Sequence, residues 1–345
     1  MLMNGEGKKI TFVLDYLGAI KQAPILIKHI QEDMPKLNID IDIQGDCFGY
    51  AEKPISREIF YEDAKKNNVN FDKIKLYSSF IPFNDGDLEV ELVVKPNSTK
   101  PSNIENYKIN DKQKLNLAID PIKFAYRKLV TGEEKERLKN IYGNKYLDTI
   151  VAGSVNSMEM DLIIDVAKEV VRKGGNKKFF IVPRTEDYNL EKFLLNSGDV
   201  KIAKRGEWLR EREPGIEFYT EPGKLDDFYS IADSAIIGDS FHKKGCGQNP
   251  LEPAFYGVRS LCGNNWHNNC IAYNGLMETG LLKVIPGNVE LNKEEVKNKL
   301  VYELLNPPSE KEIEIYKAKT KKFIEENQQE VKKYVNAIKE IIYRK

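Results

Sequence analysis

The chain has 345 residues and a mass of 39.6 kDa, a length that predicts two domains. It carries 53 Lys and Arg residues against 53 Asp and Glu residues, and a formal net charge of zero argues against charge-driven binding to nucleic acid. Hydrophobic residues make up 41% of the chain, which is enough for two packed cores and excludes general disorder. No apolar run approaches the ~20 residues of a membrane helix, and the N-terminus MLMNGEGKKITFVLD lacks a signal pattern. The sequence therefore predicts a cytoplasmic protein without a transmembrane segment.

The first part of the chain contains two clear strands and one clear helix. An apolar run predicts a strand, a helical pattern follows Gly18, and an alternating run predicts a second strand, over Lys9–Asp15, Ala19–Met34 and Asn38–Ile43 respectively. Residues 52–69 are predicted to be helical. Three prolines between residues 78 and 107 favour loops and edge strands in that region.

The later part of the chain alternates between strands and helices. This alternation predicts parallel βαβ units with right-handed crossovers, and a nearly continuous helical pattern follows over residues 309–345. Strands that end in Gly, Ser or Arg place those residues at the carboxyl edge of the sheet, where open α/β sheets bind ligands. The predicted strands are Thr149–Ala152, Lys178–Val182, Val200–Ala203, Ile216–Tyr219, Ser234–Ile237, Val258–Cys262 and Leu282–Ile285, and helices are predicted near residues 157–173, 190, 224–232 and 250–256.

Neither the cysteines nor the acidic pairs predict a metal site. No two of the four cysteines have CxxC spacing, so neither a zinc site nor a dithiol redox site is indicated. The segment Asp40-Ile41-Asp42 has the DxD form of metal-dependent sugar transferases, but it lies within an alternating strand, which favours solvent-facing acids.

The most informative segment is IIGDSFHKKGCGQN, residues 236–249, which continues into PLEPA. A strand ends near Gly238, the loop carries further glycines, and a helix is predicted to begin at Asn249. Free N–H groups at a helix N-terminus attract phosphate, and glycines let the backbone approach it closely. Glu252, one turn in, has the reach to accept hydrogen bonds from ribose hydroxyls. An alternative stays open, in which Glu252 only caps the helix and the glycines only form turns.

This segment also carries a resemblance to a known family. CGQNPLEPA, residues 246–254, resembles the GGHNPLEPA signature of bacterial 3-deoxy-D-manno-octulosonic acid (Kdo) transferases, which build the lipopolysaccharide inner core from CMP-Kdo. Six further segments resemble that family in the same order along the chain. They are Asn116-Leu117 with Asp120, Ala152-Gly153-Ser154, Val182-Pro183-Arg184, Pro222-Gly223-Lys224-Leu225 with Tyr229 and Ala232-Asp233, Gly238-Asp239-Ser240, and Gly263 to Asn268.

The resemblance implies a GT-B fold, in which two Rossmann-like α/β domains face each other across a cleft. The predicted division is an N-terminal acceptor-side domain over residues 1–112, a nucleotide-sugar-binding domain over 113–308, and a helical segment over 309–345 that returns toward the N-terminal domain. The implied nucleotide-binding residues are Gly153, Ser154, Arg184, Gly223, Leu225, Ser240, Gly247, Asn249 and Glu252, with Gly18, Ala19, His242 and Asn268 near the donor or acceptor sugar.

The chain departs from the family at the position of its catalytic acid. The family's glutamate follows the glycine of an SVGE segment, and the matching segment here is Tyr16-Leu17-Gly18-Ala19, so an alanine stands there. Ala118 replaces the lysine of NLKFD, and Gln248 replaces the histidine of GGHN. An inverting transferase needs a base for the acceptor hydroxyl, and Asp15, at the end of the first strand, is the predicted substitute; Asp46 ends the second strand. An introduced alanine and a catalytically silent nucleotide-sugar-binding protein are the other two accounts.

Three weaker signals leave alternatives open. His242 is read either as a phosphate donor or as a solvent-exposed loop residue, and Trp266 either as a base-stacking or as a packing residue. The basic stretch over residues 201–212 reads as a solvated face, with peripheral membrane contact as the alternative. The predicted function is metal-independent transfer of an ulosonic acid such as Kdo from a CMP-sugar to a glycan or glycolipid, without a cofactor. The alternatives are a UDP-sugar transferase or epimerase, or a silent binder.

Overall fold

In the computed structural model the chain divides into two compact units. Unit 1 comprises Met1–Tyr126 and Ile324–Lys345, and unit 2 comprises Arg127–Phe323. The structure describes residues 9–14, 17–35, 37–43, 64–65, 68–71, 74–77, 90–95, 105–109, 112–118, 131–142, 146–184, 202–204, 213–220, 224–266 and 270–343.

Unit 1 is built on a six-stranded sheet with the order β3-β2-β1-β4-β6-β5. All neighbouring strands are parallel except β5 and β6, which form an antiparallel pair at one edge. Helix α1 packs against β1 and β4 through a stripe of buried apolar residues, among them Ala23, Leu26, Ile27 and Ile30. The elements are β1 (Lys9–Leu14), α1 (Leu17–Asp33), β2 (Asn38–Ile43), β3 (Ile74–Tyr77), β4 (Val90–Lys95), β5 (Glu105–Ile109) and β6 (Lys112–Ala118).

Two features of unit 1 differ from the sequence prediction. The sequence predicts loops and edge strands between residues 78 and 107, but β4 is an interior strand that pairs with β1 on one side and β6 on the other. The division between the units also lies later than residue 112, because β6 completes this first sheet. The predicted helix over residues 52–69 lies largely outside the described residues.

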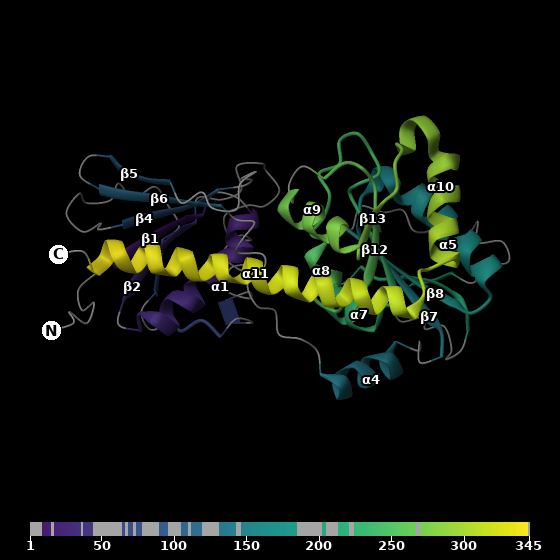
Figure 1. Cartoon of the computed structure of the whole chain (residues 1–345), viewed down its shortest axis with the longest axis horizontal. Helices are drawn as coiled ribbons and strands as arrows, with labels where there is room; N and C mark the ends of the chain where they lie inside the picture. The colour runs from purple at the N-terminus through teal and green to yellow at the C-terminus, as the bar shows by residue number, and fades with distance from the viewer. Residues whose placement is uncertain are drawn as a thin grey trace. The chain divides into compact units, whose positions relative to one another are not determined.

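Unit 2 is a doubly wound domain around a parallel seven-stranded sheet, with the order β13-β12-β11-β7-β8-β10-β9 (Figure 1). One face of the sheet packs against α5 and α10, which lie side by side, and the other against α4 and α7. Its elements are α4 (Gly132–Ile141), β7 (Asp148–Val155), η2 (Ser157–Glu159), α5 (Met160–Gly174), β8 (Lys177–Pro183), β9 (Ile202–Lys204), β10 (Gly215–Phe218), α7 (Leu225–Ile231), β11 (Ser234–Ile237), α8 (Leu251–Ala254), β12 (Arg259–Cys262), α9 (Cys270–Thr279), β13 (Leu282–Val284) and α10 (Val289–Leu305).

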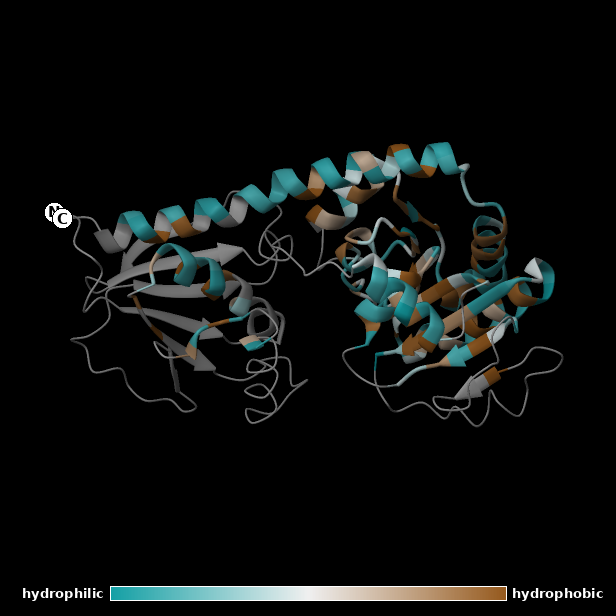
Figure 2. Ribbon diagram, turned by 90° about the horizontal axis from the view of Figure 1, so that it is seen from below, coloured by the Kyte–Doolittle hydropathy of each residue, from teal (hydrophilic) through white to brown (hydrophobic). Residues whose placement is uncertain are grey.

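The strands of unit 2 form where the sequence pattern predicts them, because both faces of a parallel sheet are buried and its strands are nearly continuous apolar runs. The interior residues of β7, β8 and β11 are buried almost throughout. Figure 2 shows this sheet as a concentration of hydrophobic residues inside a mainly hydrophilic surface.

The last helix, α11 (Glu310–Tyr343), is a single helix whose residues belong to both units. In unit 2 the Thr320 hydroxyl donates to the Thr279 hydroxyl at 2.8 Å. In unit 1 Ile338 is buried and Lys339 pairs with Asp33 of α1. Its mostly hydrophilic length carries hydrophobic residues at intervals (Figure 2), the pattern of a helix that buries one stripe.

Candidate functional site

The candidate site lies at the carboxyl edge of the unit 2 sheet, where β7 has β8 on one side and β11 on the other. From β7 the chain proceeds outward to β8 in one direction and later returns to add β11 on the opposite side. Open α/β sheets bind ligands at this kind of reversal, outside the carboxyl ends of the strands. The segments that carry the family resemblance at Gly153, Arg184 and Gly238 all end at this edge.

Close backbone approach explains two glycines at this edge. A Cβ on Gly153 would collide with the Tyr229 hydroxyl and press on the Leu225 side chain, and a Cβ on Gly238 would collide with the backbone of Ser154. The structure thus gives Gly153 and Leu225, both predicted nucleotide-binding residues, a packing contact with each other. Their predicted contact with a nucleotide stays a prediction.

Two residues at this edge adopt the left-handed backbone conformation that favours glycine. They are Ser154, with a φ of 54°, and Asp239, with a φ of 58°. Each lies at or just after the end of a neighbouring strand, and Gly238 N donates to Gly153 O between them at 2.9 Å. Unfavourable backbone conformations of this kind persist where the surrounding contacts impose them, and they concentrate at ligand sites.

Asp239 is the centre of a polar cluster at this edge. Its side chain is 4% exposed and accepts hydrogen bonds on both oxygens. Oδ1 lies 3.1 Å from Asn156 Nδ2 and 3.0 Å from His242 Nε2, and Oδ2 lies 2.8 Å from Arg184 Nη1 and 3.1 Å from Gln248 Nε2. Four side chains from three separate segments are therefore held by one carboxylate, and we call these five residues the Asp239 cluster.

Within this cluster, Arg184 is the residue that reaches the surface. Its side chain is 40% exposed, whereas that of His242 is 1% exposed. The interpretation of His242 as a solvent-exposed loop residue is therefore wrong, because Asp239 holds its ring inside the fold. The guanidinium is the group on which an anionic ligand would find a charged, bidentate donor.

A second buried acid, Glu159, ties the loop after β11 to the end of β7. Its carboxyl oxygens accept from the backbone N–H groups of Asn156 at 3.1 Å, of Ser240 and Phe241 at 3.2 Å each, and of Asp239. Burial raises the pKa of Glu159, while the backbone donors act in the opposite direction. The three successive N–H groups of residues 239–241 are therefore occupied by this side chain.

The structure gives Ser240 a role inside the fold. The residue is fully buried, its hydroxyl donates to Ile237 O at 2.7 Å, and the same oxygen accepts from Gly263 N at 2.8 Å. It ties the ends of β11 and β12 together. This geometry does not support the prediction that Ser240 lines the donor site, because a side chain without exposed surface cannot contact a ligand.

The segment after the loop also differs from the prediction. The expected helix over residues 250–256 is a single turn, α8, with Pro250 at its N-cap. The Asn249 side chain accepts from Leu251 N at 3.1 Å, and Asn249 O accepts from Glu252 N at 3.4 Å. These N–H groups already have local acceptors, and one turn carries little dipole, so phosphate attraction by a helix N-terminus does not apply here. Glu252 is half-buried.

Gly247 and Trp266 pack against each other beside the loop. Gly247 has a φ of 70°, and a Cβ there would lie 2.7 Å from Trp266 Cβ. The Trp266 ring stacks on Tyr273 with centroids 5.1 Å apart, and the Tyr273 hydroxyl donates to Gln248 O at 3.0 Å. The described partner of Trp266 is thus a packing partner, as in one of the two interpretations left open by the sequence.

The remaining predicted residues divide between unit 1 and the part of the chain that is not described. Gly18 and Ala19 lie in the first turn of α1, which follows β1. The predicted site residues Asp15, Gly223 and Asn268 lie outside the described residues, and so do Asp46 and His267.

Sequence reasoning did not assign a role to Asn156 or Glu159. The spacing of these two residues carries the signal that finds them, because an asparagine followed three positions later by a glutamate is a capping box. Both halves of the box are present at η2. What the spacing does not reveal is that the same glutamate also reaches the backbone of the loop after β11.

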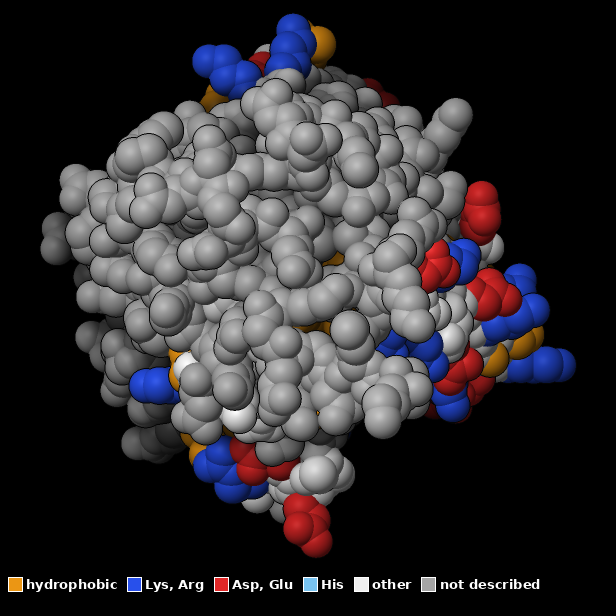
Figure 3. Space-filling model, turned by 90° about the vertical axis from the view of Figure 1, so that its left-hand side faces the viewer, with side chains coloured by type: hydrophobic (Ala, Val, Ile, Leu, Met, Phe, Trp, Pro, Cys, Tyr) orange, Lys and Arg blue, Asp and Glu red, His pale blue; other side chains and the backbone are white. Residues whose placement is uncertain are grey.

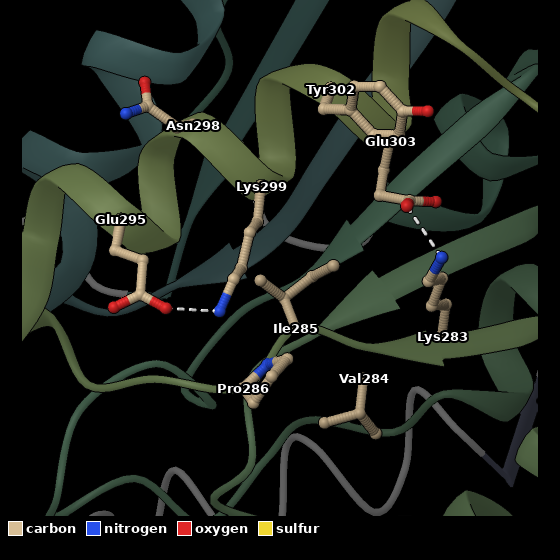
Figure 4. Close-up of a pocket in the computed structure, with 9 residues that line it drawn as sticks. All are labelled: Lys283, Val284, Ile285, Pro286, Glu295, Asn298, Lys299, Tyr302 and Glu303. Carbon is tan, nitrogen blue, oxygen red and sulfur yellow. Dashed lines mark hydrogen bonds and ion pairs between the residues drawn. The ribbon is translucent and has the colours of Figure 1, made fainter.

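Surface features outside this edge add no further polar site. Among the described residues, no three His, Cys, Asp or Glu side chains are grouped to hold a metal ion, and no described helix is long and apolar enough to cross a membrane. A hollow of about 360 Å³ lies between β13 and α10 (Figure 4), where its charged residues are joined as Lys283–Glu303 and Lys299–Glu295 ion pairs. On the described part of the face in Figure 3, basic and acidic side chains lie beside one another.

Comparison with known proteins places the chain near one group of enzymes. It is 25% identical over 229 residues to a 3-deoxy-D-manno-octulosonic acid transferase of Rickettsia felis, an alignment that covers 63% of this chain and 45% of that protein. It is 28% identical over 221 residues to the Rickettsia bellii transferase, covering 63% of this chain and 50% of that protein. The chain thus spans about half the length of the curated relatives it matches. No family model matches it.

Solved structures agree with the chain over nearly its whole length. A glycosyltransferase from Rickettsia africae superposes with a TM-score of 0.60 at 12% identity, covering 98% of this chain and 99% of that one. A UDP-GlcNAc 2-epimerase from Neisseria meningitidis superposes with a TM-score of 0.56 at 11% identity, covering 96% and 99%. At such identities the likeness concerns the fold. The chain is a Kdo transferase-like protein: it has the GT-B fold, and in sequence it resembles the bacterial Kdo transferases.

Proposed function

We propose that the chain is a glycosyltransferase that moves an ulosonic acid such as Kdo from a CMP-activated donor to a glycan or glycolipid acceptor without a metal ion. The observation that carries the proposal is the position of Arg184. It is a partly exposed cation at the strand-order reversal of unit 2, in a segment that resembles the Kdo transferases. Sequence similarity to those transferases over 63% of the chain supports the same class.

On the donor side, we assign charge neutralisation to Arg184 and recognition of the ribose to Glu252. A guanidinium suits the geometry of a phosphate or carboxylate, and it stabilises the negative charge that develops on the departing nucleotide. A carboxylate such as Glu252 accepts hydrogen bonds from two neighbouring hydroxyls. Gly153, Ser154 and Gly247 would allow the backbone near the donor, and Leu225 would pack beside it.

On the acceptor side, we assign the general base to Asp15. Ala19 has no titratable group, so it cannot remove a proton from the acceptor hydroxyl. Asp15 directly follows β1, the strand that pairs with both β2 and β4 within the sheet of unit 1. The carboxyl ends of such strands are the usual position of reactive groups in open α/β sheets.

The donor assignment predicts selective stabilisation by cytidine nucleotides. In a thermal-shift panel of CMP, UDP, GDP and ADP, we expect CMP to raise the melting temperature most, because a ligand that binds only the folded state stabilises it. An equal or larger shift with UDP would assign the chain to UDP-sugar transfer or epimerisation. Binding of CMP-sugar without product formation from any acceptor would favour a silent nucleotide-sugar-binding protein.

The ribose assignment predicts a specific loss in Glu252→Ala. We expect this variant to bind CMP more weakly by about 1.5–3 kcal/mol, the range for hydrogen bonds to a charged group. Folding should persist, since a first-turn acid contributes only about 0.3–1 kcal/mol to a helix. Calorimetry of CMP binding checks this. Glu134→Ala is the matched control, because Glu134 also lies in the first turn of a helix of unit 2. Unchanged CMP affinity in Glu252→Ala would rule out the ribose role.

A further inference from the structure

Asp239 gives Arg184 a permanent counter-ion inside the candidate site. Its Oδ2 lies 2.8 Å from Arg184 Nη1, and its side chain is 4% exposed while that of Arg184 is 40% exposed. The carboxylate therefore lies beneath the cation and the cation faces the surface. An anion that binds Arg184 from the surface lies within the width of one guanidinium of a fixed negative charge.

This arrangement brings together two departures from the pattern of the family that the chain resembles. Asp239 stands where that pattern has the second glycine of GGS, and Gln248 stands where it has the histidine of GGHN. The two residues are in contact, with Gln248 Nε2 3.1 Å from Asp239 Oδ2. His242 Nε2 lies 3.0 Å from the other oxygen. The substituted positions thus form one connected group around a new negative charge.

We propose that Asp239 is a specificity-determining residue that lowers the affinity of the site for dianionic phosphate relative to monoanionic phosphate. The inference rests on the proposed function, in which Arg184 meets the phosphate of a nucleotide. A CMP-sugar is a phosphodiester with one negative charge on phosphorus. The released CMP is a phosphomonoester whose second pKa is about 6, so it carries nearly two charges at pH 8. Asp239 therefore repels the product more than the donor phosphate and promotes its release.

Asp239→Asn removes this charge with little change in shape. Asparagine is isosteric with aspartate and is among the residues that best tolerate a φ of 58°. Its side-chain oxygen still accepts from one of the present partners, and Arg184 is exposed enough to remain hydrated. Asp239→Gly is the second variant, because glycine also adopts this conformation and removes the side chain entirely.

The test measures the affinities of CMP, of cytidine 5′-methyl phosphate and of uncharged cytidine by calorimetry at pH 8 and low salt. Coulomb's law near a protein surface predicts that Asp239→Asn binds CMP about three- to tenfold more tightly, binds the methyl ester more tightly by a smaller factor, and leaves cytidine unchanged. The effect should shrink in high salt. Asp165→Asn, which removes an acid that pairs with Lys293 at 2.6 Å elsewhere in unit 2, should change none of the three.

The outcomes separate this inference from the proposed function. If both Asp239 variants bind all three compounds with equally altered affinity, or if the ratio of CMP to methyl-ester affinity stays at the wild-type value, Asp239 is not a charge-selective residue and the inference is overturned. If the wild-type chain binds uridine nucleotides and no cytidine compound, the proposed donor is wrong, and the inference for cytidine phosphates falls with it.

Discussion

Glu159→Ala should destabilise unit 2 by roughly 3–5 kcal/mol, because it removes the acceptor of four backbone N–H groups at once. The residue is fully buried, and it joins the turn after β7 to the loop after β11. A buried N–H group left without a partner costs about 1–3 kcal/mol, and water entering the space recovers part of that loss. Glu159→Gln keeps the shape but replaces one acceptor oxygen by a donor, so we expect its stability to lie between those of wild type and Glu159→Ala.

Denaturation by urea, followed by tryptophan fluorescence, measures this effect in the intact chain. Both tryptophans, Trp208 and Trp266, fall within the residues of unit 2, so the signal reports that unit. Glu169→Gln on α5 is the control, because its ion pair with the exposed Lys173 is worth less than about 1 kcal/mol. A Glu159→Ala midpoint equal to that of the control would show that the loop after β11 does not depend on this carboxylate.

Asp15→Asn should lower turnover by a factor of about 10²–10⁴ while CMP affinity stays near the wild-type value. This range is the usual cost of losing a general base, and the proposed nucleotide site belongs to unit 2 whereas Asp15 belongs to unit 1. Steady-state kinetics with a CMP-sugar donor, together with calorimetry of CMP, separates the two quantities. Asp33→Asn, which removes an acid paired with Lys339 at the other end of α1, should leave turnover unchanged.

Ala19→Glu is the companion variant that decides between the bases. Ala19 lies in the first turn of α1, at the position where the resembling family has its catalytic glutamate. A gain of activity in Ala19→Glu, with no loss in Asp15→Asn, would show that the alanine limits the wild-type chain and that Asp15 is not the base. No activity in either form despite tight binding of CMP-sugar would favour a silent binder.

Local patterns are sufficient to predict most of unit 2. The strands β7, β8 and β11 are runs of apolar residues bounded by glycine or a charged residue, and their buried interiors require that composition whatever their neighbours are. The long final helix is equally clear from its periodicity. The ordered segments between residues 116 and 268 are also sufficient to indicate the GT-B fold and the Kdo transferase-like character.

Pairing and burial required the tertiary structure. The segment VELVVK is bounded by proline and polar residues, yet β4 lies between β1 and β6, because the place of a strand in a sheet depends on partners distant in sequence. The expected helix at Pro250 is one turn, because the Asn249 side chain and backbone take its first N–H groups.

The sequence by itself determined the fold class, the edge of the sheet at which the candidate site lies, and the importance of Arg184. Those conclusions follow from apolar periodicity and from residues that stand at the ends of strands. The tertiary structure alone decided which side chains share a partner. Asn156, Arg184 and Gln248 are far apart along the chain, and they meet only because β7, β8 and β11 are adjacent and end at one edge. There they surround Asp239, a buried charge whose cost the fold offsets by giving it several polar partners.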